Sequence, residues 1–318
     1  MRFLVTAFAC LCMAGGLTSA QGPPVGVAPY KIVAIIDHPD SVSLRAMHLN
    51  NKSEVAGRFT IAPECDVPEV SFVWSNGEFR YISFPGVFST RGESVNERGF
   101  VTGSIMLEKP ARDPVTGMCA PYFRHGFIMT PDGEFHTLPW DQVHSVVNNI
   151  TPSGWMTGPT TPCTPGELGC VYYGFLYNGR DEPVFFLPTG CDSTDAMDVN
   201  SLGDVVGVCH PVGSSGQVGN GFRLRNGASE FINYPGAMKT QLTGTNAAGK
   251  IVGQAWSPGS TPGVNFIYQR GQFAVIELVG AGAIVTATVW DINDPGTISG
   301  SFRGEDGRQR GFLARPIR

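Results

Sequence analysis

Six copies of one short pattern recur along the chain, and they constrain the fold more than any other feature. The pattern is Asn-x-x-Gly-x-(Val/Ile)-x-Gly, and its copies are anchored at Asn50, Asn96, Thr151, Asn200, Asn246 and Asn293. Thr151 replaces the anchor Asn in the third copy, and Ser53 replaces the first Gly in the first copy. Self-similarity at intervals of roughly 50 residues is typical of propellers and other repeat architectures.

A second element follows each anchor after a loop of variable length. It centres on a phenylalanine in every copy: Phe72, Phe127, Phe175, Phe222, Phe266 and Phe312. In the first five copies a tight turn comes next, such as Asn76-Gly77 or Asp132-Gly133, and Asn-Gly and Asp-Gly favour hairpin turns. Each copy therefore predicts about four short antiparallel strands, with the phenylalanines in the core.

The two ends of the chain look complementary. Units of four short strands must pack on one another to bury their faces, and a radial arrangement does this. The last copy stops soon after Phe312, whereas residues 30–36 precede the first copy and have the character of a final strand. We therefore predict an all-β fold: a six-bladed β-propeller of four-stranded antiparallel blades, with the N-terminal strand closing the last blade. An open β-solenoid is the alternative, which would not explain these ends.

The repeats resemble the HAF repeat, named for a His-Ala-Phe tripeptide, of extracellular bacterial proteins. The resemblance covers about Leu44 to Pro316 and rests on the Asn/Gly frame followed by a small residue, Phe and Leu or Ile. A complete His-Ala-Phe is absent from the sequence, and His125-Gly126-Phe127 comes nearest. The resemblance implies export and a propeller-like fold, and it carries no catalytic residues.

The first residues are typical of a secretory signal peptide. Arg2 is followed by an apolar run from Phe3 to Met13 and by the small residues Thr18-Ser19-Ala20. This run is shorter than the roughly 20 residues of a membrane span, which argues against the alternative of an anchor helix. We expect residues 1–20 to be cleaved, residues 21–318 to form one propeller domain, and the protein to be secreted or periplasmic in a bacterium, with no membrane span.

Six cysteines remain after the predicted cleavage, an even number that favours disulfides in an exported protein. They are Cys65, Cys119, Cys163, Cys170, Cys191 and Cys209. Six cysteines allow 15 pairings, so the sequence does not determine the connectivity. Proximity favours Cys65 with Cys119, Cys163 with Cys170 and Cys191 with Cys209.

Charge and motifs exclude several function classes. The 27 acidic residues outnumber the 22 basic ones, which argues against a nucleic-acid partner. The sequence contains no Gly-x-Ser-x-Gly elbow, no His-Glu-x-x-His, no phosphate-binding Gly-rich loop and no EF-hand loop.

The position two residues before each anchor differs between copies, and function on a repeated scaffold is expected where the copies differ. It reads His48, Ser94, Asn149, Asp198, Gly244 and Asp291. If these residues belong to the innermost strands, they ring a central channel, where His48, Asn149, Asp198 and Asp291 are candidate ligands of a divalent cation. The alternative is that they form ordinary hydrogen bonds in the channel wall.

Three functions remain open from the sequence. The leading prediction is an exported, non-enzymatic binding or interaction module, a monomer whose ligand is an extracellular protein or glycan. The second is an enzyme, a metal-assisted hydrolase or lyase that uses the polar channel residues. The third is a carbohydrate-binding propeller that uses aromatic residues outside the phenylalanine series: Trp74, Trp140, Trp155, Trp256, Trp290, Tyr172 and Tyr173.

Overall fold

The computed structural model describes residues 26–62, 67–112, 116, 119, 123–140, 144–163, 170–214, 216–259, 263–280 and 282–317. In this part of the chain every regular element is a β-strand, so the predicted all-β class is confirmed. None of the described residues form a helix with the length and apolar character needed to cross a bilayer. The predicted signal peptide lies outside the described residues and stays a prediction.

The strands follow the repeats along the chain. In order, they are β1 (Val27–Ile36), β2 (Ser43–Leu49), β3 (Val55–Thr60), β4 (Val70–Ser75), β5 (Glu78–Ile82), β6 (Ser89–Val95), β7 (Val101–Met106), β8 (His125–Met129), β9 (Phe135–Thr137), β10 (His144–Ser145), β11 (Asn149–Ile150), β12 (Met156–Thr161), β13 (Tyr173–Tyr177), β14 (Val184–Phe186), β15 (Cys191–Val199), β16 (Val205–Pro211), β17 (Asn220–Arg225), β18 (Ala228–Phe231), β19 (Lys239–Thr245), β20 (Ile251–Trp256), β21 (Val264–Gln269), β22 (Gln272–Val279), β23 (Ile284–Ile292), β24 (Ile298–Gly304) and β25 (Gln309–Pro316).

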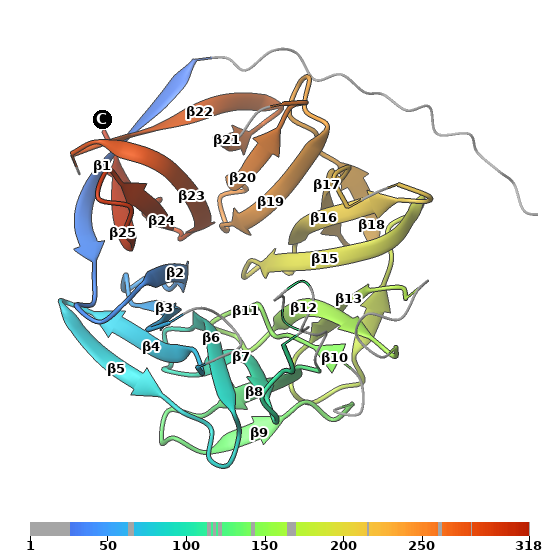
Figure 1. Ribbon diagram of the computed structural model, residues 1–318. Helices are drawn as coiled ribbons and strands as arrows, with labels where there is room; N and C mark the ends of the chain where they lie inside the picture. Colours follow the sequence, from blue (N-terminus) through green and yellow to red (C-terminus); the bar gives the residue numbers. More distant parts are fainter. Residues whose placement is uncertain are drawn as a thin grey trace, which may run out of the picture.

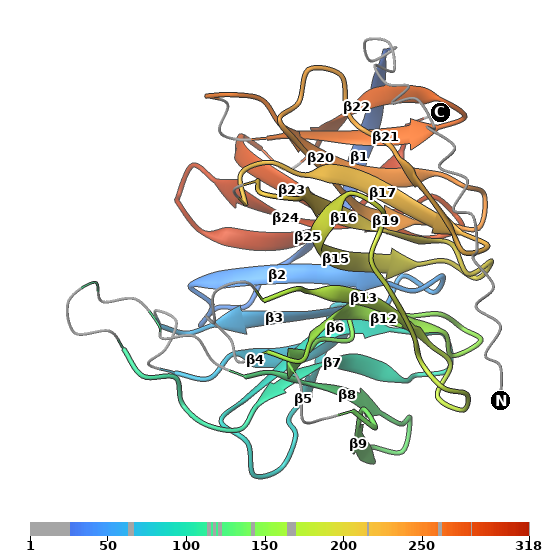
Figure 2. The same cartoon turned by 90° about the vertical axis from the view of Figure 1, so that its right-hand side faces the viewer.

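Successive strands pair antiparallel within each copy of the repeat. Two copies form separate four-stranded sheets, β6–β9 and β15–β18, and the third forms a five-stranded sheet because its first strand is interrupted between β10 and β11. The remaining strands join into one 12-stranded sheet. The strand groups lie around a common centre, with β2, β6, β15, β19 and β23 innermost (Figure 1). In the side view β20–β25 lie above β3–β9 (Figure 2).

The N-terminal strand β1 lies against the last strand of the chain. It pairs antiparallel with β25, from Tyr30 opposite Pro316 to Ile36 opposite Gly311, as the complementary ends predict. It also runs parallel to β22, which the sequence did not indicate. Through these two pairings β1 connects the fifth and sixth copies into one sheet.

The core explains both the phenylalanine series and the second glycine of the repeat. All six phenylalanines are completely buried, as predicted. Opposite Phe266, a Cβ atom added to Gly253 would lie 2.7 Å from the ring and 2.5 Å from the carbonyl oxygen of Gln241. A Cβ atom at Gly57, Gly103, Gly207 or Gly300 would meet the same pair of obstacles, a ring and an inner-strand carbonyl. This position therefore requires glycine because ring and backbone already fill the space.

The first half of the repeat forms a tight turn. The side-chain Oδ1 of Asn50 accepts hydrogen bonds from the backbone of Lys52 and Glu54, both at 3.0 Å. Three residues after the anchor the backbone is left-handed, with φ of 87° at Gly99 and 82° at Gly203. Ser53 has the same conformation in the first copy, with φ of 63°. The predicted structural role of the Asn and Gly residues agrees with this geometry.

The anchors also link neighbouring groups. Each anchor Asn donates its side-chain amide to the backbone carbonyl of the next anchor at 3.0–3.3 Å: Asn50 to Asn96, Asn96 to Thr151, Asn200 to Asn246, Asn246 to Asn293 and Asn293 to Asn50. Thr151 has no amide to donate, and its hydroxyl instead bonds Ser153 at 3.0 Å. The series of bonds is therefore interrupted between the third and fourth copies.

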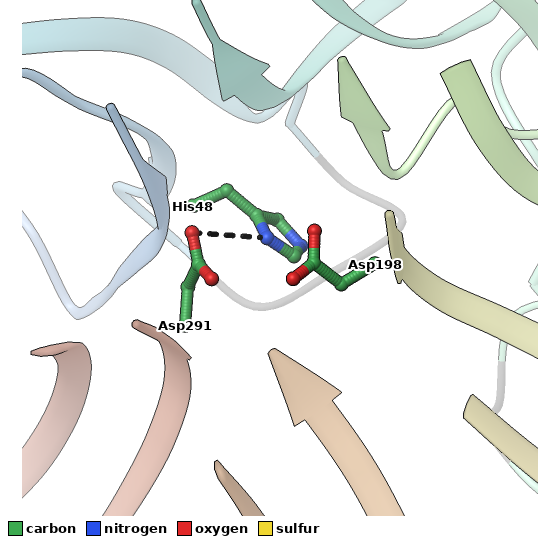
Figure 3. A group of neighbouring side chains, drawn as sticks. All are labelled: His48, Asp198 and Asp291. Atoms are coloured by element: carbon green, nitrogen blue, oxygen red, sulfur yellow. Dashed lines mark ion pairs between the residues drawn. The ribbon is translucent and has the colours of Figure 1, made fainter. Parts of the chain in front are cut away.

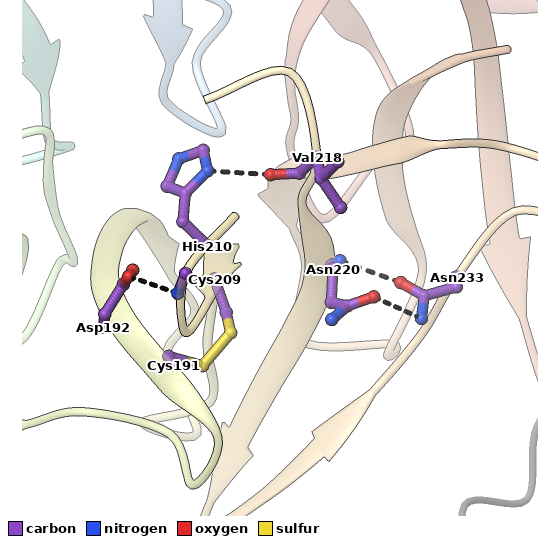
Figure 4. The surroundings of a disulfide bond; sticks show 9 residues. Cys191, Asp192, Cys209, His210, Val218, Asn220 and Asn233 are labelled. Atoms are coloured by element: carbon purple, nitrogen blue, oxygen red, sulfur yellow. Dashed lines mark hydrogen bonds between the residues drawn. A yellow bond between two sulfur atoms is a disulfide. The ribbon is translucent and has the colours of Figure 1, made fainter. Parts of the chain in front are cut away.

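One of the predicted disulfides is present. Cys191 and Cys209 are joined, with Cα atoms 5.7 Å apart, and tie β15 to β16 (Figure 4). Cys119 is disulfide-bonded as well, but Cys65 lies outside the described residues, so that pair stays a prediction. No disulfide joins Cys163 to Cys170 in the structure, so this predicted pair is not confirmed.

Candidate metal centre

A bulge interrupts the innermost strand of most groups just before the anchor. The register shifts between Ala46 and Leu49 in β2, between Ala196 and Asp198 in β15, and between Val289 and Asp291 in β23. A bulge bends the strand and redirects the side chains beside it. The residues two positions before the anchors are thereby turned toward the centre of the ring.

His48, Asp198 and Asp291 meet at this centre, although they come from β2, β15 and β23. One ligand atom from each residue lies within 4.8 Å of the other two (Figure 3). The Nδ1 atom of His48 is 3.5 Å from Oδ2 of Asp291. All three side chains are buried, with exposed fractions of 1% to 3%.

The fourth predicted ligand, Asn149, also touches the cluster. Its Nδ2 atom lies 3.3 Å from Nδ1 of His48. Ser94, which occupies the equivalent position in the second copy, is also buried. Gly244 has no side chain to contribute. The structure thus brings together all four candidate residues from the sequence, with Asn149 as a neighbour of His48 rather than a member of the triad.

Backbone amides hold both carboxylates in place. Asp198 accepts bonds from its neighbour Val199 at 2.8 Å and from Thr245 of the next group at 2.5 Å. Asp291 likewise accepts from Ile292 at 2.6 Å and from Leu49 at 3.0 Å. Each carboxylate oxygen has a second lone pair, so these bonds leave acceptor capacity for a cation. The carboxylates are therefore positioned before any ligand arrives.

The electrostatics of the cluster favour an additional positive charge. Burial raises the pKa of Asp198 well above its ordinary value, and the nearby charge of Asp291 raises it further. Burial alone would lower the pKa of His48, but its hydrogen bond to Asp291 and the surrounding carboxylates outweigh this effect and raise it. Two carboxylates at one buried site are stable only if protons or a cation compensate their charge.

The donor set indicates which cations fit. Three ligand atoms that all lie within 4.8 Å of one another are candidate ligands of a single ion, whose bonds to such ligands are about 2.0–2.4 Å long. Ca²⁺ and Mg²⁺ prefer oxygen ligands only, whereas imidazole with carboxylates suits Mn²⁺, Fe²⁺ or Zn²⁺. We therefore expect a divalent transition metal or zinc rather than Ca²⁺.

Cavities lie on both sides of the cluster along the inner strands. Asp198, Asp291 and Asn149 line a small cavity of about 60 Å³ on the side of the anchors. On the opposite side is a larger cavity of about 470 Å³, lined by Met47, Met197 and Trp290, the residues directly before His48, Asp198 and Asp291. His48, Asp198 and Asp291 themselves do not line this larger cavity.

The comparisons with known proteins show similarity of shape. No family model and no curated protein matches the chain. A calcium-binding protein described as regucalcin, from Agrobacterium tumefaciens, is 11% identical with a TM-score of 0.49, covering 92% of this chain and 97% of its own. A gluconolactonase from Xanthomonas campestris is 11% identical with a TM-score of 0.48, covering 95% of this chain and 99% of its own.

The leading functional prediction, a non-enzymatic binding module, is wrong in light of these findings. The structures of similar shape are described as a gluconolactonase and a calcium-binding protein. Since this likeness is one of shape at very low identity, the function proposed below rests on the His48–Asp198–Asp291 cluster. The sequence alone could not show that His48, Asp198 and Asp291 form one site, because they are up to 291 − 48 = 243 positions apart in the chain.

Proposed function

We propose that this protein is a metal-assisted hydrolase whose divalent cation is held by His48, Asp198 and Asp291. The observation that carries the proposal is the convergence of three ligand atoms, from three separate strands, within 4.8 Å at a buried site. Channel walls can contain isolated polar residues without a ligand, but two buried carboxylates beside an imidazole need charge compensation that a cation supplies.

A cation at this site would supply Lewis-acid activation of water and of a carbonyl oxygen. The backbone bonds from Val199, Thr245, Ile292 and Leu49 would keep the carboxylates from rotating away. Asn149, bonded to the His48 ring, would fix the orientation of the imidazole. The 470 Å³ cavity beside the cluster has the size of a small-molecule site.

We further propose that the ring is a six-bladed propeller in which β1 completes the last blade. The antiparallel pairing of β1 with β25 and the bond from Asn293 to Asn50 support this closure. Export of the protein is a related proposal, supported by the Cys191–Cys209 disulfide, because such bonds persist mainly outside the cytoplasm.

Elemental analysis of the purified protein, followed by hydrolysis assays, tests the proposed function. We expect one Mn²⁺, Fe²⁺ or Zn²⁺ per chain, and metal-dependent hydrolysis of at least one member of a panel of lactones, carboxylic esters and phosphate esters. The variants Asp198→Asn and Asp291→Asn should lose the metal and the activity together. Ser94→Ala, at the equivalent position of another group, is the matched control and should keep both.

A protein that binds no divalent cation at equilibrium would contradict the metal site. A protein that binds the cation but hydrolyses no member of the panel would contradict the hydrolase and leave a structural metal centre. The two parts of the proposal therefore fail separately.

A further inference from the structure

We infer that the 470 Å³ cavity beside the cluster binds a small, neutral, polyhydroxylated ligand, a sugar of one or two rings, through Asp195, Thr194 and Trp290. The inference rests on the proposed function, because it names the class of substrate that the hydrolase would take. Binding of the sugar itself requires no cation. The cavity volume lies within the usual range for small-molecule sites.

Several polar atoms on the cavity wall have no hydrogen-bond partner among the described residues. The Oδ1 atom of Asp195, Oγ1 of Thr194 and Nε1 of Trp290 are buried and make no hydrogen bond to the described residues. A buried polar atom without a partner costs about 1–3 kcal/mol, and native structures contain few of them. The Nε atom of Arg58, on the same wall, also makes no hydrogen bond, but it is paired with the Glu69 carboxylate at 3.2 Å. The other three, one acceptor, one donor and one hydroxyl that can do both, point to a ligand that supplies the missing bonds.

The charges around the cavity are already compensated. The guanidinium of Arg58 contacts Glu93 at 2.5 Å and Glu69 at 3.2 Å, and all three side chains are buried. Asp195 lies in the field of Arg124, which also lines the cavity. Since the acidic and basic groups balance, the wall presents hydrogen-bonding groups without a strong net charge, which favours a neutral ligand over an anion or a cation.

Apolar side chains make up the rest of the wall. Met47, Met197, Val146 and Trp290 line the same cavity as the polar groups. A sugar ring presents hydroxyls at its edge and C–H groups on its face, so it requires both kinds of contact, and aromatic rings provide suitable surfaces for the C–H face. The mixed lining therefore matches a sugar better than a purely polar metabolite.

His210 extends the polar wall and is held in place by the disulfide region. It follows Cys209 directly, and its Nδ1 atom is 3.0 Å from the carbonyl oxygen of Val218 (Figure 4). Because the carbonyl accepts, Nδ1 donates, and the neutral ring leaves Nε2 as an acceptor. An acceptor fixed in this way is suited to a ligand hydroxyl.

Calorimetric titration with a defined panel tests the inference. The probes are glucose, galactose, maltose and cellobiose as neutral sugars, with gluconate and glucosamine as charged counterparts. We expect at least one neutral sugar to saturate the EDTA-treated protein below about 10 mM and to bind more tightly than its charged counterparts. Asp195→Ala and Trp290→Phe should each weaken binding about tenfold, since each removes one of the bonds supplied to the ligand.

Matched controls separate this site from the metal centre and from general damage. Asp192→Ala changes an acidic residue on the same strand, and Trp155→Phe changes a tryptophan that does not line the cavity; both should bind as the unmodified protein does. Asp195→Leu, which has a similar branched shape and no acceptor, serves if Asp195→Ala does not fold. Asp198→Asn should lose metal and keep sugar binding.

Three results would overturn the inference: no neutral sugar binds, a charged probe binds more tightly than the neutral sugars, or both cavity variants bind as the unmodified protein does.

Discussion

The side-chain amide of Asn293 donates a 3.0 Å hydrogen bond to the backbone carbonyl of Asn50, which lies 243 residues earlier in the chain. The bond joins the sixth copy of the repeat to the first, in the same geometry by which Asn246 bonds Asn293. The anchor Asn therefore has two roles: it shapes the turn within its own copy, and it bonds the backbone of the next copy. The bond is absent after Thr151 because threonine has no side-chain amide to donate.

Thr151→Asn should stabilise the protein by about 1 kcal/mol, because the new amide can donate to the carbonyl of Asn200 as the other anchors do. The Oδ1 atom would take over the bond that the Thr151 hydroxyl now accepts from the backbone of Trp155 at 3.0 Å. Urea unfolding followed by tryptophan fluorescence measures the change. Asn246→Ala, which removes an existing link, is the opposite control and should destabilise; a neutral or harmful Thr151→Asn would contradict the linking role.

Gly253→Ala should destabilise the protein by about 1–3 kcal/mol, since its Cβ atom would meet the Gln241 carbonyl and the Phe266 ring. Gly216→Ala is the matched control, because its added Cβ would meet nothing within 4 Å and its backbone is not left-handed. We expect this control to unfold at the same urea concentration as the original protein or at a slightly higher one. Equal effects of the two substitutions would show that packing does not explain the second glycine.

Much of the fold can be predicted from the repeats. The spacing of Asn, Gly and Phe predicts the turn, the inner strand and the buried ring, because each depends on contacts within one copy. The pairing of β1 with β25 can be predicted because the last copy lacks a strand that residues 30–36 can supply. The parallel contact of β1 with β22 depends on how two neighbouring copies pack, and no pattern within a copy reports it.

The candidate metal site can be predicted only in part from the repeats. The variable position before the anchor indicates His48, Asp198 and Asp291 as channel residues, but their mutual distance depends on which copies lie across the ring. Asp195 belongs to no motif of the repeat, and it lies directly before the bulge between Ala196 and Asp198 in β15. The second glycine of the repeat gives a partial indication of where Asp195 lies. A Cβ atom added to Gly207 would be 2.1 Å from the backbone carbonyl oxygen of Asp195, so this carbonyl faces the glycine.

Reduction of the Cys191–Cys209 disulfide should lower stability by about 3 kcal/mol, the value expected for a closed loop of this length. Thermal unfolding with and without a reducing agent measures the effect. The variant Cys191→Ala/Cys209→Ala isolates this bond, and it should unfold at a lower temperature and respond less to reduction than the original protein does. A variant that unfolds at the same temperature as the original protein would show that this disulfide does not stabilise the fold.

Removal of the cation should lower the unfolding temperature if His48, Asp198 and Asp291 hold it. A ligand present at one hundred times its dissociation constant stabilises the folded state by about 2.7 kcal/mol. EDTA should therefore destabilise the protein, and Mn²⁺ or Zn²⁺ should restore it, whereas Ca²⁺ should restore less because the site includes an imidazole. The same titration on Asp291→Asn should show no response, and a full response in that variant would place the cation elsewhere.

The carboxyl group of Asp195 should make stability fall as pH rises between about 4 and 6. Burial, the largest cause, and the charge of Glu93 raise its pKa from 3.8 to about 6, although the charges of Lys239 and Arg124 oppose the shift. A raised pKa means that the folded protein holds a proton that the unfolded chain has released in this range, so the folded state loses its advantage as pH rises through it.

Asp195→Asn should remove this dependence. The substituted protein should match the original near pH 4, where the carboxyl is protonated, and exceed it by about 1–3 kcal/mol above pH 6. Urea unfolding at several pH values measures the difference, with Asp192→Asn on the same strand as the control. A difference that grows toward low pH instead would mean that Asp195 is stabilised as the carboxylate. The expected gain in stability of Asp195→Asn above pH 6, together with the weaker sugar binding of Asp195→Ala, is the pattern of a group kept at a site for a ligand rather than for the fold.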